Sequence, residues 1–287
     1  MKKSINDVYF GITKNDEPLS LDIPEINEQD EKGDTLLHFA IREQNEKAVK
    51  ILGNKNINPL VRNKNGMSGM TLAASYDNVN ILNYLIQTYI DMLTDVDKSE
   101  MLACSVIHNL KDNVECMISH KFNPLNDFRG DPIIIWAIQS EDLEMIKLLV
   151  NHGSSINASN DEGHTLLYNT AAEGLDNILK WLIEMGADIE KKDHKGNTPL
   201  IIACCYNQLR IVELLVEHGA NTNAKNNRGC SPLLYAVKHA DIDIVKLLVH
   251  NGADVSAKDM EGKGINDYLA KISDGEVKKM IKNIIVD

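Results

Sequence analysis

The chain has 287 residues, of which 42 are Asp or Glu and 30 are Lys or Arg, so its formal net charge is −12. This acidity argues against a nucleic-acid partner, because a phosphate-binding surface needs clustered Lys and Arg. The hydrophobic share of 43% excludes a wholly disordered chain, and no apolar run reaches the ~18 residues that a membrane span needs. We therefore expect neither nucleic acid nor membrane among its partners.

The first 29 residues combine a short helical pattern with two prolines. Apolar side chains recur at helical spacing at Ile5, Val8, Tyr9 and Ile12. The polar residues around them interrupt the long apolar stretch that a secretory signal would need. We interpret residues 1–29 as a shortened N-terminal cap of the units that follow.

From residue 30 onward, the sequence repeats with a period of 33 residues. Glycines recur at this step in two series, Gly130, Gly163, Gly196, Gly229 and Gly262, and Gly153, Gly186, Gly219 and Gly252. Apolar pairs follow the same step at Leu148-Leu149, Trp181-Leu182, Leu214-Leu215 and Leu247-Leu248. A period of this length predicts stacked structural units in place of one deep core.

In the clearest unit, residues 193–225, the characteristic residues each have a physical reason. Gly196 supplies the positive φ of a tight turn, and Thr198 can cap a helix that has Pro199 at its first position. A second apolar stripe at helical spacing follows, and Gly219 ends it as a left-handed cap. Each unit is therefore predicted to be a hairpin-like turn followed by two helices.

We expect seven such units and a C-terminal capping repeat. Their predicted bounds are 30–62, 63–93, 94–126, 127–159, 160–192, 193–225 and 226–258, with the capping repeat at 259–287. Two units depart from the pattern, since 63–93 has Ser68-Gly-Met-Thr at the helix start and 94–126 lacks the turn glycine. In the unit at 94–126, the stretch between its helices could be shifted by one residue.

The helix-start motif reads Thr198-Pro-Leu-Ile-Ile-Ala, and related versions begin at Thr35, Thr165 and Ser231. It resembles the Thr-Pro-Leu-His-x-Ala hallmark of the ankyrin repeat, whose unit is also about 33 residues. The resemblance implies an all-α fold, an ankyrin-repeat solenoid of helix-turn-helix units with hairpin-like turns, of about seven repeats plus terminal caps. It also implies that His38, at the histidine position of the motif, hydrogen-bonds between neighbouring units.

The same resemblance implies a non-catalytic protein-protein interaction scaffold that binds a partner through its concave face. In this family the hairpin turns and the outward edge of each first helix form that face, where side chains are free of packing duty. The expected turn contacts are Glu31, Lys32, Met67, Phe128, Arg129, Asp131, Glu162, His164, His194, Lys195 and Arg228. The expected first-helix contacts are Arg42, Glu43, Tyr76, Gln139, Glu173, Tyr206, Lys238 and His239.

Bulky residues in this set are the expected anchors, because interface energy concentrates in aromatic and Arg side chains. They are Tyr76, Phe128, Arg129, Tyr206 and His239. Two interpretations of Phe128 remain open. It is either an anchor at an exposed turn or a packing residue beneath the irregular unit that precedes it.

Catalytic, cofactor-binding and metal-binding residues are not predicted. Gly-x-Ser-x-Gly, His-Glu-x-x-His and the phosphate-binding loop are all absent from the sequence. The five cysteines are odd in number and lack Cys-x-x-Cys spacing, which argues against a disulfide framework or a zinc site and favours the reducing cytoplasm. Several histidines precede the second glycine series, where helix ends favour partial positive charge.

Several functions are compatible with such a chain. The net charge favours a basic partner, such as an enzyme or toxin that the chain would neutralise as an immunity protein does. The excess of Lys over Arg, with abundant Asn and Ile, is typical of AT-rich genomes, which include those of bacteria and large DNA viruses. A secreted effector or a viral host-range factor that binds host proteins is the alternative, and an enzyme on the same scaffold is the least favoured. We expect a monomer when the chain is alone.

Overall fold

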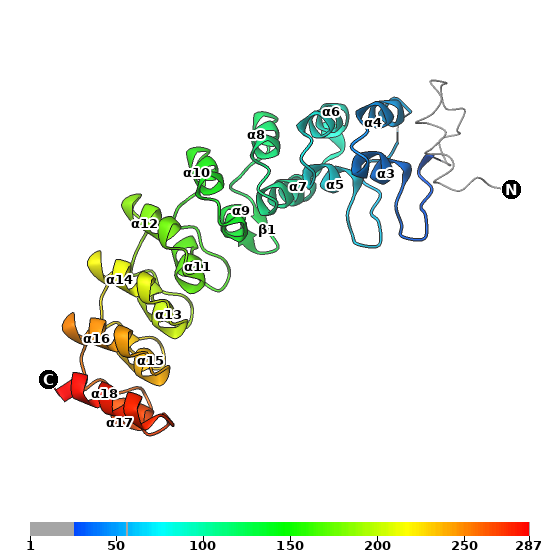
Figure 1. The fold of residues 1–287 in the computed structure, drawn as a ribbon. Coiled ribbons are helices and arrows are strands. Elements are labelled where there is room, and N and C mark those ends of the chain that lie inside the picture. The colour runs from blue at the N-terminus through cyan, green and yellow to red at the C-terminus, as the bar shows by residue number, and fades with distance from the viewer. Residues whose placement is uncertain (1–25, 56, 287) are drawn as a thin grey trace. The chain divides into compact units, whose positions relative to one another are not determined.

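The computed structural model describes residues 26–55 and 57–286, and within them the regular secondary structure is helical apart from two short strands (Figure 1). The chain forms two compact lobes. The N-terminal lobe extends to Arg129 and includes Asn151–Gly153, and the C-terminal lobe comprises Gly130–Val150 and the chain from Ser154 onward. Residues 1–25 of the predicted N-terminal cap lie outside the described residues, while Ile26 is buried.

The N-terminal lobe consists of two rows of helices. Its elements are α3 (Leu36–Arg42), α4 (Glu46–Gly53), α5 (Gly69–Ala74), α6 (Val79–Tyr89), the 3₁₀ helix η1 (Ile90–Met92), α7 (Asp95–Ile107), α8 (Lys111–Ser119) and the strand β1 (Asp127–Phe128). Helices α3, α5 and α7 pack side by side in the first row, and α4, α6 and α8 pack in the second. The buried apolar side chains between the rows are mainly Leu, Ile, Val, Met and Ala.

The C-terminal lobe repeats this arrangement. It contains the strand β2 (Asp131–Pro132), α9 (Ile133–Trp136), the 3₁₀ helix η2 (Ala137–Ser140), α10 (Leu143–Asn151), α11 (Leu166–Glu173), α12 (Asp176–Glu184), α13 (Pro199–Cys205), α14 (Leu209–Glu217), α15 (Pro232–Lys238), α16 (Ile242–His250), α17 (Ile265–Leu269) and α18 (Gly275–Val286). Helices α11, α13, α15 and α17 form one row, and α12, α14, α16 and α18 form the other. The hairpin turns extend beyond the first row (Figure 1). The all-α repeat class is confirmed, while the exact unit bounds stay a prediction.

Local sequence explains where the first helices begin. The side chains of Ser68, Thr165, Thr198 and Ser231 each accept a hydrogen bond from a backbone N–H in the first turn, as good N-caps do. Proline occupies the first position of α13 and of α15, where its missing N–H costs nothing. The small, fully buried Ala203 lets α13 lie close to its neighbours. These short helices gain most of their stability from stacking.

The unit at 94–126 contains the one-residue shift that its sequence indicated. The loop between paired helices adopts positive φ at Asn207 and Ala240, but in this unit it does so at Asn109, one residue later than the 33-residue register predicts. Lys121 then takes the left-handed position that Gly153 holds in the next unit, again one residue late. The missing turn explains the change, because α7 starts directly at the Thr94 cap and continues for 13 residues.

Candidate functional site

Backbone hydrogen bonds tie the tips of neighbouring hairpin turns together. In the C-terminal lobe His194 donates to the Glu162 carbonyl at 3.0 Å, and Asn227 donates to the Lys195 carbonyl at 2.9 Å. The next bond in this ladder runs from Met260 N to Arg228 O at 2.9 Å. In the N-terminal lobe, the N–H of Lys64 makes the equivalent 3.0 Å bond to Lys32 O. Each lobe therefore holds its turn tips at fixed spacing.

An Asp or Asn side chain closes most of the turns from within. Asp193 accepts bonds from the N–H groups of Lys195 at 2.9 Å and Asn197 at 2.7 Å. The Asn226 amide does the same for its own turn and donates to Asn197 Oδ1 at 2.8 Å, which links two adjacent turns. The Asn227 side chain also donates to the His194 carbonyl at 3.0 Å, whereas the exposed side chains of His194, Lys195 and Arg228 take no part in these bonds and stay available for contacts outside the fold.

The structure places most of the predicted contact residues at the surface. The exposed members in the N-terminal lobe are Glu31, Lys32, Glu43 and Arg129, and those in the C-terminal lobe are Gln139, Glu162, Glu173, His194, Lys195, Tyr206, Arg228, Lys238 and His239. The half-buried members are Arg42, Met67, Tyr76 and Phe128 in the N-terminal lobe and Asp131 and His164 in the C-terminal lobe. Each lobe thus brings its own set together, and their role in binding stays a prediction.

His164 contributes to the packing of the C-terminal lobe. Its ring stacks on Tyr168 with the centroids 4.0 Å apart and the planes inclined by 8°. Its Nε2 lies 3.8 Å from a carboxylate oxygen of the buried Asp193 and 3.5 Å from Glu162. In the N-terminal lobe, the Arg129 guanidinium lies 5.0 Å from the centroid of the half-buried Phe128 ring. A partner that contacts Phe128 would therefore find its ring already engaged in a cation–π pair with Arg129.

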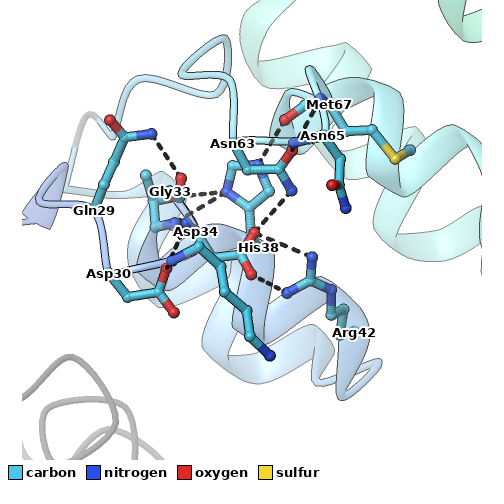
Figure 2. Close-up of polar contacts among 11 residues, drawn as sticks. Gln29, Asp30, Gly33, Asp34, His38, Arg42, Asn63, Asn65 and Met67 are labelled. Carbon is cyan, nitrogen blue, oxygen red and sulfur yellow. Dashed lines mark hydrogen bonds and ion pairs between the residues drawn. The ribbon is translucent and has the colours of Figure 1, made fainter.

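A buried polar network joins the first two units of the N-terminal lobe (Figure 2). His38 Nδ1 accepts from the Thr35 N–H at 3.1 Å, so its Nε2 is the donor to the Met67 carbonyl at 2.9 Å. This bond between units confirms the role that the ankyrin resemblance implied for His38. The Met67 backbone is thereby used in the fold, while its side chain is half-buried.

Asp34 lies at the centre of the same network and is only 1% exposed. Its carboxylate pairs with the Arg42 guanidinium and accepts a bond from Asn63 Nδ2 at 2.8 Å (Figure 2). Burial alone would raise the pKa of Asp34, but the hydrogen bonds from Arg42 and Asn63 outweigh it and hold that pKa below its ordinary value. Arg42, a predicted contact residue, thus stabilises the fold as well.

The last units of the C-terminal lobe contain a surface groove that sequence reasoning missed. A cavity of about 540 Å³ opens between the turns and the first helices α15 and α17. Besides the predicted Arg228 and Lys238, its walls include Tyr235, Tyr268 and Lys271. A sequence signal for the groove does exist, because the pattern Tyr-x-x-Lys occurs at Tyr235–Lys238 and again 33 residues later at Tyr268–Lys271. The second copy lies in residues 259–287, for which only a capping role was predicted.

Tyr268 is fixed in this groove by its hydroxyl group. The hydroxyl donates to Asp259 Oδ2 at 2.7 Å and lies 3.8 Å from Cys230 Sγ. Burial and the bond to Asp259 raise the pKa of Tyr268, so the phenol stays protonated at neutral pH. The ring is therefore a fixed wall of the groove.

Whether the described residues include an activated nucleophile or a metal site depends on their thiols, histidines and carboxylates. Burial raises the pKa of the Cys104 thiol to about 11, which keeps it protonated at neutral pH and a poor nucleophile. Burial, followed by the neighbouring Lys238, lowers the pKa of His239. In residues 26–55 and 57–286, no three His, Cys, Asp or Glu side chains are grouped so as to hold a metal ion. No helix in the same residues has the length and apolar character to cross a membrane.

Comparison with known proteins identifies the family. The family model for ankyrin repeats (3 copies) matches residues 14–95, 101–193 and 171–259. None of the curated proteins compared matches the chain. The matched segments cover well over half of the sequence, and the paired helices and linked turns agree with them. The chain therefore belongs to the ankyrin-repeat family.

Proposed function

We propose that the chain is a non-catalytic scaffold that binds a partner protein through its turn tips and the ends of its first helices. The observation that carries this proposal is the ladder of backbone bonds that fixes the tips, where side chains such as Glu162, Lys195 and Arg228 are exposed. A surface fixed before binding loses little conformational entropy when a partner docks, so more of the contact energy appears as affinity. The family supports the same role, since ankyrin repeats are generally protein-interaction modules.

Tyr206 is the strongest single anchor of this surface in the C-terminal lobe. It follows the end of α13, and 59% of it is exposed. A tyrosine there can bury a large ring at low entropic cost and still use its hydroxyl for a hydrogen bond. Lys195 and His194 lie at the tip of the turn that precedes the same helix.

The test compares two double variants of the whole chain as bait for partner proteins. Tyr206→Ala with Lys195→Ala removes one bulky side chain and one cation from the proposed surface. Met185→Ala with Lys180→Ala removes an exposed apolar side chain and a cation from the second-helix side. Cross-linking and quantitative mass spectrometry should show loss of partners with the first variant and retention with the second. Equal recovery by both would contradict the proposed surface.

Neutralisation of a basic enzyme or toxin, as by an immunity protein, is a narrower form of this proposal, and the net charge of −12 favours it. In the C-terminal lobe the proposed surface includes exposed carboxylates, namely Asp161 and Glu162 in a turn and Glu173 at the end of α11. Such a partner should lose its activity when the chain binds in a purified mixture. Capture of host proteins alone, with no enzyme inhibited, would instead favour the effector or viral host-range alternative.

A further inference from the structure

Two lysine–tyrosine pairs stand next to each other at the end of the C-terminal lobe. The Lys238 ammonium lies 5.6 Å from the centroid of the Tyr235 ring, and the Lys271 ammonium lies 5.6 Å from that of Tyr268. The two pairs occupy the same register position of successive units, and α15 packs against α17. Stacked helices lie roughly 8–10 Å apart, which sets the approximate spacing of the two ammonium groups.

The groove that these pairs line is continuous with smaller hollows. The cavity of about 540 Å³ contains both pairs together with Arg228. A hollow of about 320 Å³ shares Lys238 and Lys271 with it, and one of about 440 Å³ shares Arg228 and Tyr235. Met260 also lines the groove and is 79% exposed, so an apolar contact is available beside the cations.

Three of the four cations that line this groove, Arg228, Lys238 and Lys271, lack carboxylate partners among the described residues. The two carboxylates that line the groove are already engaged within it, because Glu261 pairs with Lys263 and Asp259 accepts a hydrogen bond from the Tyr268 hydroxyl. The groove is therefore a basic strip on an acidic chain.

The N-terminal lobe shows why these lysines are left unpaired. Arg42 stands eight residues after Asp34 and pairs with it. Lys238 occupies the position of Arg42 in its own unit, but the residue eight positions before it is Cys230. For Lys271 the corresponding residue is Lys263, which is not a carboxylate either and already pairs with Glu261. Both lysines thus keep their charge available to a ligand.

We propose that this groove binds an extended acidic segment of a partner protein, with carboxylates meeting Lys238 and Lys271 along the two tyrosine rings. This inference rests on the proposed scaffold function and names the chemistry of one of its partners. In an extended chain of the polyproline II type, which has three residues per turn, acidic residues three positions apart lie on the same face and are separated by roughly 9 Å, which suits the spacing of the two units. The tyrosine rings offer flat apolar walls to the segment between the carboxylates.

Fluorescence anisotropy tests the proposal with a labelled 12-residue Gly/Ser peptide that carries Glu at every third position. A peptide with Gln at the same positions should bind the whole protein about tenfold more weakly, as expected for two lost ion pairs. Lys238→Ala with Lys271→Ala should weaken binding of the Glu peptide by a similar factor. Lys180→Ala with Lys246→Ala removes the same charge from the second helices and should leave its affinity unchanged.

Cys230→Asp is a sharper variant, because it restores the carboxylate that Asp34 supplies to Arg42 without removing a lysine. It should weaken binding of the Glu peptide, and circular dichroism should show that the helices are intact. Equal binding of the Glu and Gln peptides, equal loss in the two lysine double variants, or tighter binding of a single-stranded oligonucleotide through Lys238 and Lys271 would overturn the proposal. If partner capture still depends on Tyr206 and Lys195, such results reject the acidic segment but leave the scaffold function standing.

Discussion

Replacing Arg42 with alanine should destabilise the N-terminal lobe by about 2–3 kcal/mol. The size follows from the contacts, since Arg42 Nη2 donates to Asp34 Oδ1 at 3.1 Å and Nη1 donates to Oδ2. Removing one partner of a fully buried ion pair costs roughly 3–5 kcal/mol. The expected cost lies at or just below the lower end of that range because 33% of the Arg42 side chain is exposed, so water can partly replace the guanidinium.

The pair can be isolated by a double-mutant cycle with Asp34→Asn. The neutral amide can still accept a bond from Asn63 but needs no cation, so Arg42→Ala should cost much less in that background. The coupling free energy should then exceed about 1 kcal/mol. Asp34 also predicts a pH dependence, because its folded pKa lies below the ordinary 3.8. The stability it contributes is present above pH 3.8 and is lost as the pH falls through the folded pKa, and Arg42→Ala should abolish that loss.

Urea unfolding followed by two probes measures these effects. Both tryptophans, Trp136 and Trp181, belong to the C-terminal lobe, whereas far-UV circular dichroism reports helices of both lobes. Comparing the two signals therefore separates the N-terminal contribution. A coupling free energy below about 0.5 kcal/mol would refute the reasoning, since additive effects mean that the two groups do not interact. Arg42 would then be free to act only as the contact residue that its sequence position predicts.

Four further substitutions test the repeat geometry by the same unfolding assay. Gly196→Ala should cost about 2 kcal/mol or more, because φ is 77° and the added Cβ would lie 2.8 Å from Asn227 N, whereas Gly219→Ala meets open space and should cost only about 1 kcal/mol. Ala240→Gly should stabilise the C-terminal lobe by about 0.5–1 kcal/mol, because φ is 59° there and glycine adopts a positive φ more easily than alanine. A destabilising effect would contradict this reasoning. His38→Ala should destabilise the N-terminal lobe by about 2 kcal/mol through the carbonyl it leaves unpaired, and an unchanged midpoint would show that water replaces the ring.

The sequence was sufficient to predict the helices because each unit repeats the same local chemistry. Thr198 caps α13 as expected, and Gly196 and Gly219 adopt the positive φ expected of them. The one-residue shift in the unit at 94–126 could also be predicted from the sequence, because the missing turn glycine breaks the 33-residue register there. Helix boundaries within a unit depend on neighbours within a few residues, so a single sequence carries that information.

Burial and charge pairing were harder to predict. Register alone placed Arg42 and His164 among the outward positions, yet Arg42 pairs with buried Asp34 and His164 stacks on Tyr168. The net charge favoured an acidic surface, but a net charge does not say which face carries it. Only the side-chain contacts show that Lys238 and Lys271 lie over tyrosine rings without a carboxylate partner in the described residues.

One register position can therefore serve folding in one unit and recognition in another. The cation at the end of the first helix is Arg42 in the first unit and Lys238 in the last complete one. What differs is the residue eight positions earlier, a carboxylate at Asp34 and a thiol at Cys230. Because the backbone ladder holds the turn in either case, exchanging this residue alters the charge offered to a partner while the turn keeps its own bonds. Within this fold, the surface can thus diverge from unit to unit without a corresponding change in the architecture that supports it.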